Sequence, residues 1–515
     1  MARAAALQMR KLGRPFLLLF AVFGVILVAT SAAPAAQKKL EVLKPAAYPG
    51  LQHLRYRFGP IKVESGQNTI EVKVNDNKPQ VPGYITRFAP NLIYAKNGQV
   101  PRVDVVHLHH GVWLMDGRPT FAAGEEKTSF DFPSGYGLHH DPQDVWLMNY
   151  MVHNLHPTPT SVYLTYDIDF LPDTEAAAAS ITPVKPLWMD VAGLRAYPVF
   201  DVLRGSGTDG KYTFPDQATG AERAKIGPAH TFTAPFNMSL VAAAGHLHPG
   251  GLWTDLEATR GQQQKLLFRS EAKYFEPAGA VSWDVALTAT KPDWRIALKK
   301  GDRLDLSATY DSKRGSWYES MGIDVMFYVD GIRPDAVDPF AGGVDPVGLV
   351  THGHLPENDN HGGKKVVLPD ARKLPSGPSV GNVKIRNYVY GYGNLGSGRR
   401  GRPPVVKVGR SITFTNLDAT RSTPVGTSAY HTITACKAPC NKDTGIAYPL
   451  ADAKIDFDSG ELGYGPTGFT AAANRNSWKT PKALPPGTYT YFCRIHPFMR
   501  GSFRVTKAGK VTARG

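Results

Sequence analysis

A cysteine, two histidines and a methionine in the last part of the chain are spaced as ligands of a single metal ion. The segment reads Tyr491-Phe-Cys493-Arg-Ile-His496-Pro-Phe-Met499, a Cys-x2-His-x2-Met pattern, and His431 lies upstream of it. A thiolate, two imidazoles and a weak thioether are the ligands of a blue, or type 1, copper site, which transfers single electrons. The sequence therefore predicts one copper ion on His431, Cys493, His496 and Met499.

Histidines also gather in three segments of the N-terminal half. The segments are His107-Leu-His109-His110, Met151-Val-His153 and His246-Leu-His248. Residues two apart in a strand face the same side, so His246 and His248 can bind one metal ion. Surface or hydrogen-bonded histidines would explain any one segment. Three segments in a chain that already carries copper ligands favour metal binding.

The residues around the cysteine motif predict the elements that hold it. Residues 407–416 are typical of a strand, and residues 488–493 of the strand that enters the ligand loop. This region resembles the plastocyanin and amicyanin family of cupredoxins, and the short loop with Pro497-Phe498 is most similar to amicyanin. The resemblance implies a Greek-key β-sandwich. A multicopper oxidase would need a His-Cys-His element, but Arg494 follows Cys493.

The order of the N-terminal histidines is similar to that of the copper type II, ascorbate-dependent monooxygenases, which are peptidylglycine α-hydroxylating monooxygenase and dopamine β-monooxygenase. The stretches 107–113 and 351–356 also resemble the plant stress-up-regulated nodulin family. The monooxygenase resemblance implies two further copper sites. It assigns an electron-accepting copper to His109, His110 and His153, and an oxygen-binding, catalytic copper to His246, His248 and Met321.

Other residues could replace some of these ligands. His107 could pair with His109 in place of His110, His139-His140 could replace either, and Met326 is the alternative to Met321. Three more histidines are expected at a polar surface, with an accessory metal as the alternative: His352, His354 and His361.

The three cysteines all lie in the last 80 residues. Cys436 and Cys440 are expected to form a local disulfide in an oxidising compartment. A binuclear copper centre would need a histidine and a methionine just after Cys440, and neither is there. Residues 37–435 contain no cysteine, whereas the animal monooxygenases are rich in disulfides. Packing alone must therefore stabilise that region.

The first 36 residues are typical of an export signal. Basic residues precede an apolar stretch, and Ala33-Pro-Ala35 is a candidate cleavage site. The apolar core is shorter than the roughly 20 residues of a membrane span, so cleavage is expected, with an uncleaved anchor as the alternative. The protein is therefore expected to be secreted or to lie elsewhere outside the cytoplasm, in the cell envelope.

Composition and turn spacing predict an all-β protein. The 515 residues are 42% hydrophobic and 20% charged, which is ordinary for two or three globular domains. Alternating runs such as 162–170 and 324–329 are separated by Pro- and Gly-rich turns. We expect two jelly-roll-like β-sandwich subdomains, a linker and a cupredoxin β-sandwich, at residues 37–195, 196–357, 358–377 and 378–515.

The formal charge of +15 is spread along the chain. Its only dense basic patch, at 399–407, lacks aromatic residues between its charges, so nucleic acid is not expected as a partner. The sequence predicts that type 1 copper passes electrons to a copper centre that hydroxylates an unknown organic substrate with dioxygen. A redox partner protein or a small reductant such as ascorbate would supply the electrons. The alternative is a non-enzymatic electron-transfer or copper-binding protein with a degenerate monooxygenase scaffold.

Overall fold

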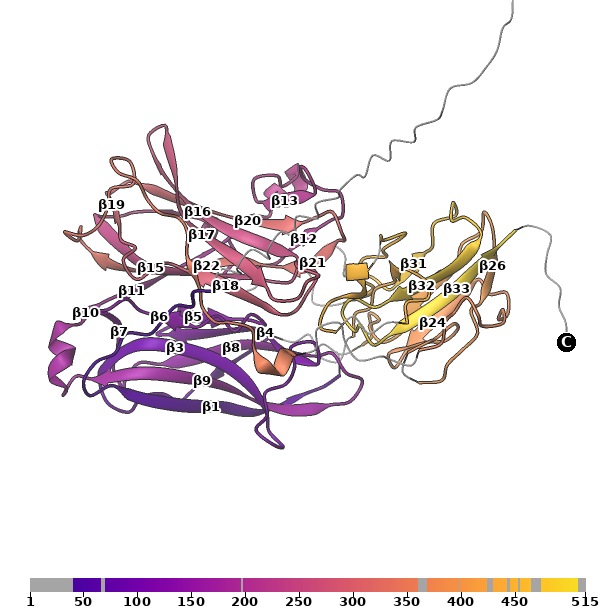
Figure 1. Ribbon diagram of the computed structural model, residues 1–515, viewed down its shortest axis with the longest axis horizontal. Helices are drawn as coiled ribbons and strands as arrows, with labels where there is room; N and C mark the ends of the chain where they lie inside the picture. Colours follow the sequence, from indigo (N-terminus) through magenta and orange to yellow (C-terminus); the bar gives the residue numbers. More distant parts are fainter. Residues whose placement is uncertain are drawn as a thin grey trace, which may run out of the picture. The chain divides into compact units, whose positions relative to one another are not determined.

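The computed structural model describes residues 40–65, 70–195, 198–359, 368–396, 398–423, 429–441, 445–452, 454–464 and 474–507. The predicted signal peptide lies outside them, as does His361. The described residues are nearly all strand and loop, which confirms the all-β prediction (Figure 1). No helix in these ranges is long and apolar enough to cross a membrane. The short helical turns are η1 (Ala176–Ser180), α1 (Gly220–Arg223), η2 (Pro228–His230), η3 (Pro356–Asn358) and η4 (Pro449–Asp452).

Two sheets form the first sandwich. One has the order β1-β9-β3-β7-β10, with β6 paired to β3, and the other has the order β2-β8-β4-β5. In Figure 1, β1, β9 and β3 run side by side. The bounds are β1 (Gln52–Val63), β2 (Glu71–Val74), β3 (Gly83–Tyr94), β4 (Val106–Met115), β5 (Arg118–Ala123), β6 (Phe130–Asp131), β7 (Tyr136–His140), β8 (Trp146–Asn154), β9 (Thr160–Pro172) and β10 (Thr182–Pro183).

A large sheet dominates the second region. Its order is β11-β22-β15-β18-β17-β16-β20-β13, with β14, β19 and β23 added to β20, β15 and β18, and a separate pair joins β12 to β21. Because β11 pairs with β22, residues 185–190 belong to this sheet and not to the first sandwich. The bounds are β11 (Lys185–Asp190), β12 (Phe200–Val202), β13 (Lys211–Phe214), β14 (Thr231–Thr233), β15 (Met238–Leu247), β16 (Gly251–Arg260), β17 (Gln263–Tyr274), β18 (Val285–Ala289), β19 (Ile296–Leu298), β20 (Arg303–Asp311), β21 (Trp317–Ser320), β22 (Gly322–Asp330) and β23 (Leu349–Val350).

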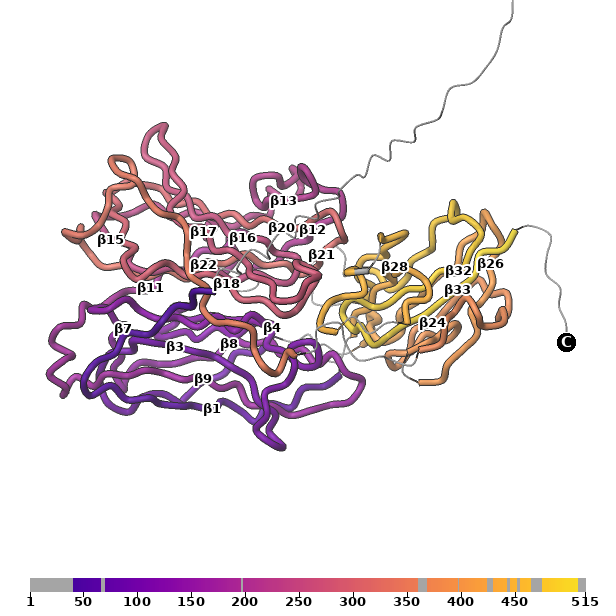
Figure 2. Tube along the Cα trace, in the orientation of Figure 1, coloured from indigo at the N-terminus to yellow at the C-terminus, as the bar shows by residue number. Residues whose placement is uncertain are grey.

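The C-terminal sandwich is built from two four-stranded sheets, β25-β24-β27-β31 and β26-β33-β32-β28, with the pair β29-β30 beside them. The traces of β32 and β33 run next to each other in Figure 2. The bounds are β24 (Asn382–Arg386), β25 (Val389–Tyr390), β26 (Val405–Lys407), β27 (Thr413–Asn416), β28 (Thr434–Cys436), β29 (Gly463–Tyr464), β30 (Asn474–Arg475), β31 (Ser477–Lys479), β32 (Gly487–Phe492) and β33 (Arg500–Thr506).

The first sandwich and the large sheet share one apolar core. Alternate residues of β22, including Ile323 and Phe327, point into the core of the first sandwich, where Phe327 packs on Phe132 with ring centroids 4.6 Å apart. Met326, which has the opposite parity, packs in the core on the other face of the sheet. This shared core brings β15 and β22 against β4 and β5, so histidines far apart in sequence can meet.

Candidate metal centres

The predicted type 1 ligands meet at one end of the C-terminal sandwich. Cys493 directly follows β32, Met499 directly precedes β33, and His431 lies just before β28. The Cys493 Sγ atom is 3.8 Å from His431 Nδ1 and 3.7 Å from His496 Nδ1. The three residues are buried, with ligand atoms close enough together to hold one metal ion. Met499 is fully buried in the same loop. We call these four residues the type 1 site.

Backbone hydrogen bonds fix the ligand loop around the sulfur. The N–H groups of Thr432 and His496 both donate to Cys493 Sγ, each at 3.4 Å. The N–H of Cys493 donates to the Met499 carbonyl, and the N–H of Met499 donates to the His496 carbonyl. These hydrogen bonds fix the position of the sulfur relative to the two histidines.

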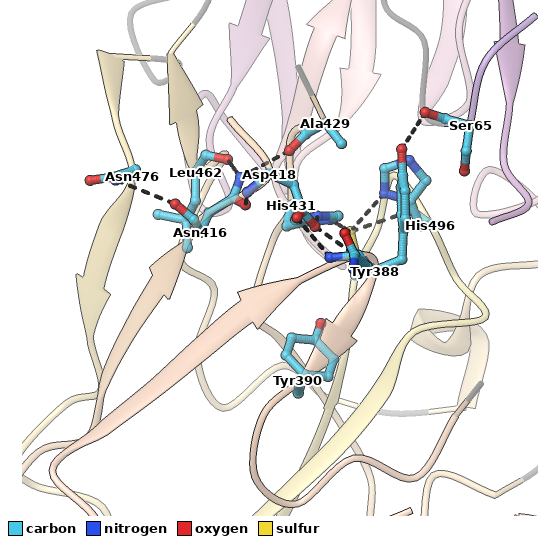
Figure 3. A network of polar contacts seen from close by, with 12 residues as sticks. Ser65, Tyr388, Tyr390, Asn416, Asp418, Ala429, His431, Leu462, Asn476 and His496 are labelled. Atoms are coloured by element: carbon cyan, nitrogen blue, oxygen red, sulfur yellow. Dashed lines mark hydrogen bonds and ion pairs between the residues drawn. The ribbon is translucent and has the colours of Figure 1, made fainter. Parts of the chain in front are cut away.

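Asp418 and Tyr388 hold the histidines of the type 1 site in place (Figure 3). His431 Nε2 lies 3.0 Å from an Asp418 carboxylate oxygen, and the backbone N–H groups of Asn387 and Tyr388 donate to the same carboxylate. The Tyr388 ring packs edge-on against both His431 and His496. A carboxylate on the far nitrogen of a ligating imidazole orients the ring and makes it a stronger donor.

The donor set fits copper, and the ring of His496 is in the neutral form that binds it. Burial lowers the pKa of His431, but the Asp418 carboxylate and Cys493 outweigh burial and raise it to about 9. Burial, and then the neighbouring His431, hold the pKa of His496 well below its usual value, so its ring is neutral. His496 Nε2 is buried without a hydrogen-bond partner among the described residues. One thiolate, two imidazoles and a nearby thioether are the ligands that select copper over zinc or calcium.

The N-terminal histidines come together in a second buried group, the histidine cluster: His107, His109, His110, His153, His246 and His248. Strand β4 pairs with β8 so that His107 lies opposite His153, and a β-bulge follows between Leu108 and His110. The extra residue of that bulge is His109, and bulges re-aim side chains in this way. Its ring centroid lies 4.4 Å from that of His153 and 4.4 Å from that of His248.

The two copper sites that the sequence predicts therefore lie side by side. His109 belongs to the predicted electron-accepting set and His248 to the predicted oxygen-binding set, yet their rings are in contact. The ring of His246 lies next to that of His248, and the Nδ1 atom of His246 is 2.9 Å from a Glu126 carboxylate oxygen. The Nε2 atoms of His246 and His248 are buried without hydrogen-bond partners in the described ranges. Buried imidazole nitrogens without partners suit metal coordination.

Glu319 is a candidate ligand that sequence reasoning did not find. Its carboxylate and the rings of His109 and His153 place their ligand atoms within 4.8 Å of one another. The residue has φ of +53°, a conformation that is rare outside glycine and costs free energy. Its position two residues before Met321 was the available signal, because that stretch was already assigned to a copper site. The positive φ of Glu319 could be found only from the structure.

Met321 lies near the histidine cluster, whereas the alternative histidines contact other partners. Met321 lies just before β22 and packs in the same core as Ile323. In the pairing of β15 with β22, Leu247 lies opposite Gly322, so Met321 lies next to the end of β15. His139 contacts Asp173, and His140 contacts Asp144 and the Pro79 carbonyl. His352 and His354 contact the Glu126 carbonyl and two aspartates, respectively. These four histidines therefore do not join the histidine cluster.

One cavity of about 80 Å³ connects the two groups of ligands. His109, His153, His248 and Glu319 line it, and so does His496 of the type 1 site. Five aromatic residues also form part of its walls: Trp283, Trp317, Tyr318, Tyr430 and Tyr448. Burial, and then neighbouring imidazoles, hold the pKa values of His109, His153 and His248 well below the usual value. These rings are neutral and therefore ready to bind metal. We call this space the shared cavity.

The disulfide expected from the sequence is present. Cys436 and Cys440 are bonded, and Cys493 is the free, buried cysteine.

Comparison with known proteins gives no family assignment. No family model matches the chain, and no curated protein matches it. Among solved structures, a purple cupredoxin from Nitrosopumilus maritimus is 20% identical over 25% of this chain and all of its own, with a TM-score of 0.15. A variant of amicyanin in the Cu(I) form is 18% identical over 27% of this chain and 93% of its own, with a TM-score of 0.15. A copper-containing nitrite reductase from Thermus scotoductus is 17% identical over 52% of this chain and 55% of its own, with a TM-score of 0.16. With TM-scores this low, the function has to be argued from the sites themselves.

Proposed function

We propose that this chain is an exported copper oxidoreductase in which the type 1 site passes electrons to copper held by the histidine cluster. The observation that carries this proposal is the double position of His496. The ring belongs to the type 1 ligand set and also forms a wall of the shared cavity that His109, His153 and His248 line. An imidazole in both places gives a short route for an electron between the two groups.

Copper on imidazole ligands would activate dioxygen in the shared cavity, and hydroxylation of an organic substrate is the reaction we assign to it. One C–H bond, dioxygen, two protons and two electrons, which the type 1 site would deliver one at a time from the external reductant, give the hydroxylated product and water. The chain's own contribution is to hold the metal ligands in place. The neutral rings of His109, His153 and His248 present lone pairs to a metal ion. Met321, beside the end of β15, fits the soft ligand of the oxygen-binding site. A redox protein or a small reductant such as ascorbate would reduce the type 1 site.

Glu126 orients His246, one of the histidines of this second site. Its carboxylate accepts a hydrogen bond from His246 Nδ1, and the backbone N–H of Gly124 donates to the same oxygen. Burial raises the pKa of Glu126, but the His246 ring outweighs burial and lowers it, so Glu126 is ionised. An ionised partner fixes His246 with its free nitrogen facing away from Glu126.

A second candidate function is electron transfer without catalysis. The type 1 ligands all come from the C-terminal sandwich and need nothing from the histidine cluster. An exported carrier with a degenerate second site would have the same C-terminal structure.

Copper analysis and electron paramagnetic resonance of the oxidised protein separate the two candidates. The oxidoreductase is expected to hold more than one copper per chain and to show both type 1 and type 2 signals. His109→Ala should remove the type 2 signal and leave the blue colour intact, whereas His139→Ala, outside the histidine cluster, should change neither. One copper per chain, unaffected by His109→Ala, would establish the carrier.

The reaction itself is tested by a single turnover. The fully reduced protein is mixed with dioxygen, and the return of the blue absorption is followed. Fast return in the wild type and in His139→Ala, with slow return in His109→Ala, is expected if electrons leave through the shared cavity. Equal rates in all three proteins would refute that route.

A further inference from the structure

The side chain of Arg494 is a buried cation, and two of its three nitrogens have no hydrogen-bond partner among the described residues. It follows Cys493 in the ligand loop, and its backbone N–H donates to Thr432 Oγ1 at 2.9 Å. Its side chain is only 5% exposed and lines the shared cavity. The guanidinium carbon lies 4.5 Å from the centroid of the Trp317 ring and 5.5 Å from that of Tyr448. Stacking on these rings fixes the plane of the cation but uses none of its N–H groups.

Two donors of Arg494 have no acceptor within the described ranges. These are Nε and the NH1 nitrogen. The carboxylate nearest to NH1 belongs to Asp458, at 3.8 Å, which is too long for a hydrogen bond. The other oxygen of Asp458 is already occupied by the N–H of Gly460 and the hydroxyl of Thr434. An arginine always carries its charge, and burying that charge without hydrogen bonds is costly. Asp458 therefore supplies an ion pair but no hydrogen bond, and the cavity offers a place for an acceptor that would bind Arg494 more closely.

The charge of Arg494 itself decides the sign of that acceptor. Three carboxyl side chains also line the cavity, those of Glu125, Glu319 and Glu461. Glu319 places a ligand atom within 4.8 Å of those of His109 and His153, so it would share its charge with a metal ion held there. Among the described residues that line the cavity, Arg494 is the one arginine or lysine, and its two unpaired nitrogens would bind an anionic acceptor more strongly than a neutral one.

We propose that Arg494 binds the anionic end of the substrate, which is a small planar oxyanion or short carboxylate. This inference rests on the proposed function, because it places the anion between Arg494 and the copper of the histidine cluster. A guanidinium donates hydrogen bonds to carboxylate-like oxygens more strongly than to neutral acceptors. The cavity of about 80 Å³ has room for a small anionic group beside Arg494.

The test uses formate as the probe and formamide as its neutral counterpart of the same size. Binding to the copper-loaded protein is measured by calorimetry and by the type 2 resonance signal. Formate is expected to bind and formamide to bind much more weakly. Arg494→Met should weaken formate binding about 10- to 100-fold, as expected for hydrogen bonds to a charged group. Arg410→Met, which removes an exposed arginine of the same sandwich, should have no effect.

Two controls keep the outcomes distinct. The blue absorption of Arg494→Met shows whether the ligand loop is intact. If that variant does not fold, Arg494→Lys is used, because lysine keeps the charge. Arg494→Lys should bind formate more weakly than the wild type does, but it should still bind formate more tightly than formamide. Equal affinity for formate and formamide, or unchanged formate affinity in Arg494→Met, would overturn the proposal.

The proposed function can fail separately from this inference. If copper analysis finds the histidine cluster empty but formate still binds through Arg494, the anion site stands and the oxidoreductase does not. If both copper sites are filled and formate binding does not depend on Arg494, the oxidoreductase stands and the anion site is refuted.

Discussion

Replacing Asp418 with asparagine should weaken the type 1 site without removing any ligand. The Asp418 carboxylate lies 3.0 Å from His431 Nε2 and is itself fixed by the backbone N–H groups of Asn387 and Tyr388 (Figure 3). Burial raises the pKa of Asp418, but the His431 ring and these N–H groups outweigh burial and lower it, so the side chain is ionised. Asparagine keeps the shape and one acceptor oxygen but loses the charge.

The magnitude follows from the role of Asp418 as the partner of a ligating imidazole. Removing such a partner typically weakens metal binding about 10- to 100-fold, or about 1.4 to 2.7 kcal/mol. The asparagine variant should lie near the lower end, because it retains one hydrogen bond. The reduction potential should rise, because the lost negative charge stabilised the oxidised copper more than the reduced copper.

The assay is a competition titration for copper together with a spectroelectrochemical titration of the blue absorption. Asp456→Asn is the matched control, because Asp456 is an exposed aspartate of the same sandwich. It should leave copper affinity unchanged. An Asp418→Asn protein with wild-type copper affinity and an unchanged or lower reduction potential would refute the argument.

Three further predictions concern other parts of the chain. Burial raises the pKa of Asp324 to about 7, so the stability that its protonated form contributes is full below about pH 4 and lost as the pH rises to about 7. Asn cannot ionise, so the unfolding free energy of Asp324→Asn, measured in urea, should rise by about 4 kcal/mol relative to that of the wild type between about pH 4 and about pH 7. Glu319→Gln should weaken copper at the histidine cluster, seen as loss of the type 2 signal, with the blue colour unchanged. Reducing the Cys436–Cys440 disulfide should cost about 2 kcal/mol of unfolding free energy for so short a loop, and an unchanged melting temperature would contradict this.

The type 1 site could be predicted from the sequence because most of its geometry is local. Cys493, His496 and Met499 lie within seven consecutive positions of one loop, so their spacing nearly determines their separation in space. Only His431 is distant, and the resemblance to the plastocyanin and amicyanin family assigned it to the same site. The all-β class was predictable for a similar reason, because residue alternation and turn spacing are local properties of the chain.

The histidine cluster was only partly predictable, because it depends on packing between sheets. The sequence named its histidines but divided them between two sites, since nothing local shows that β15 packs against β4. The bulge at His109 also changes which side chains face each other, and a bulge cannot be read from residue types alone. Glu319 and Arg494 were missed because each acts through a neighbour in another element.

Burial of the type 1 histidines favours internal electron transfer over a carrier function. A carrier that exchanges electrons with soluble partners benefits from a ligand edge at the surface, because electron transfer slows steeply with distance. Here neither His431 nor His496 has exposed area. Tyr388 covers both rings, and its hydroxyl is hydrogen-bonded to the carbonyl of Ser65 in the first sandwich. The open space that His496 does face is the shared cavity, which is the exit that the proposed function requires.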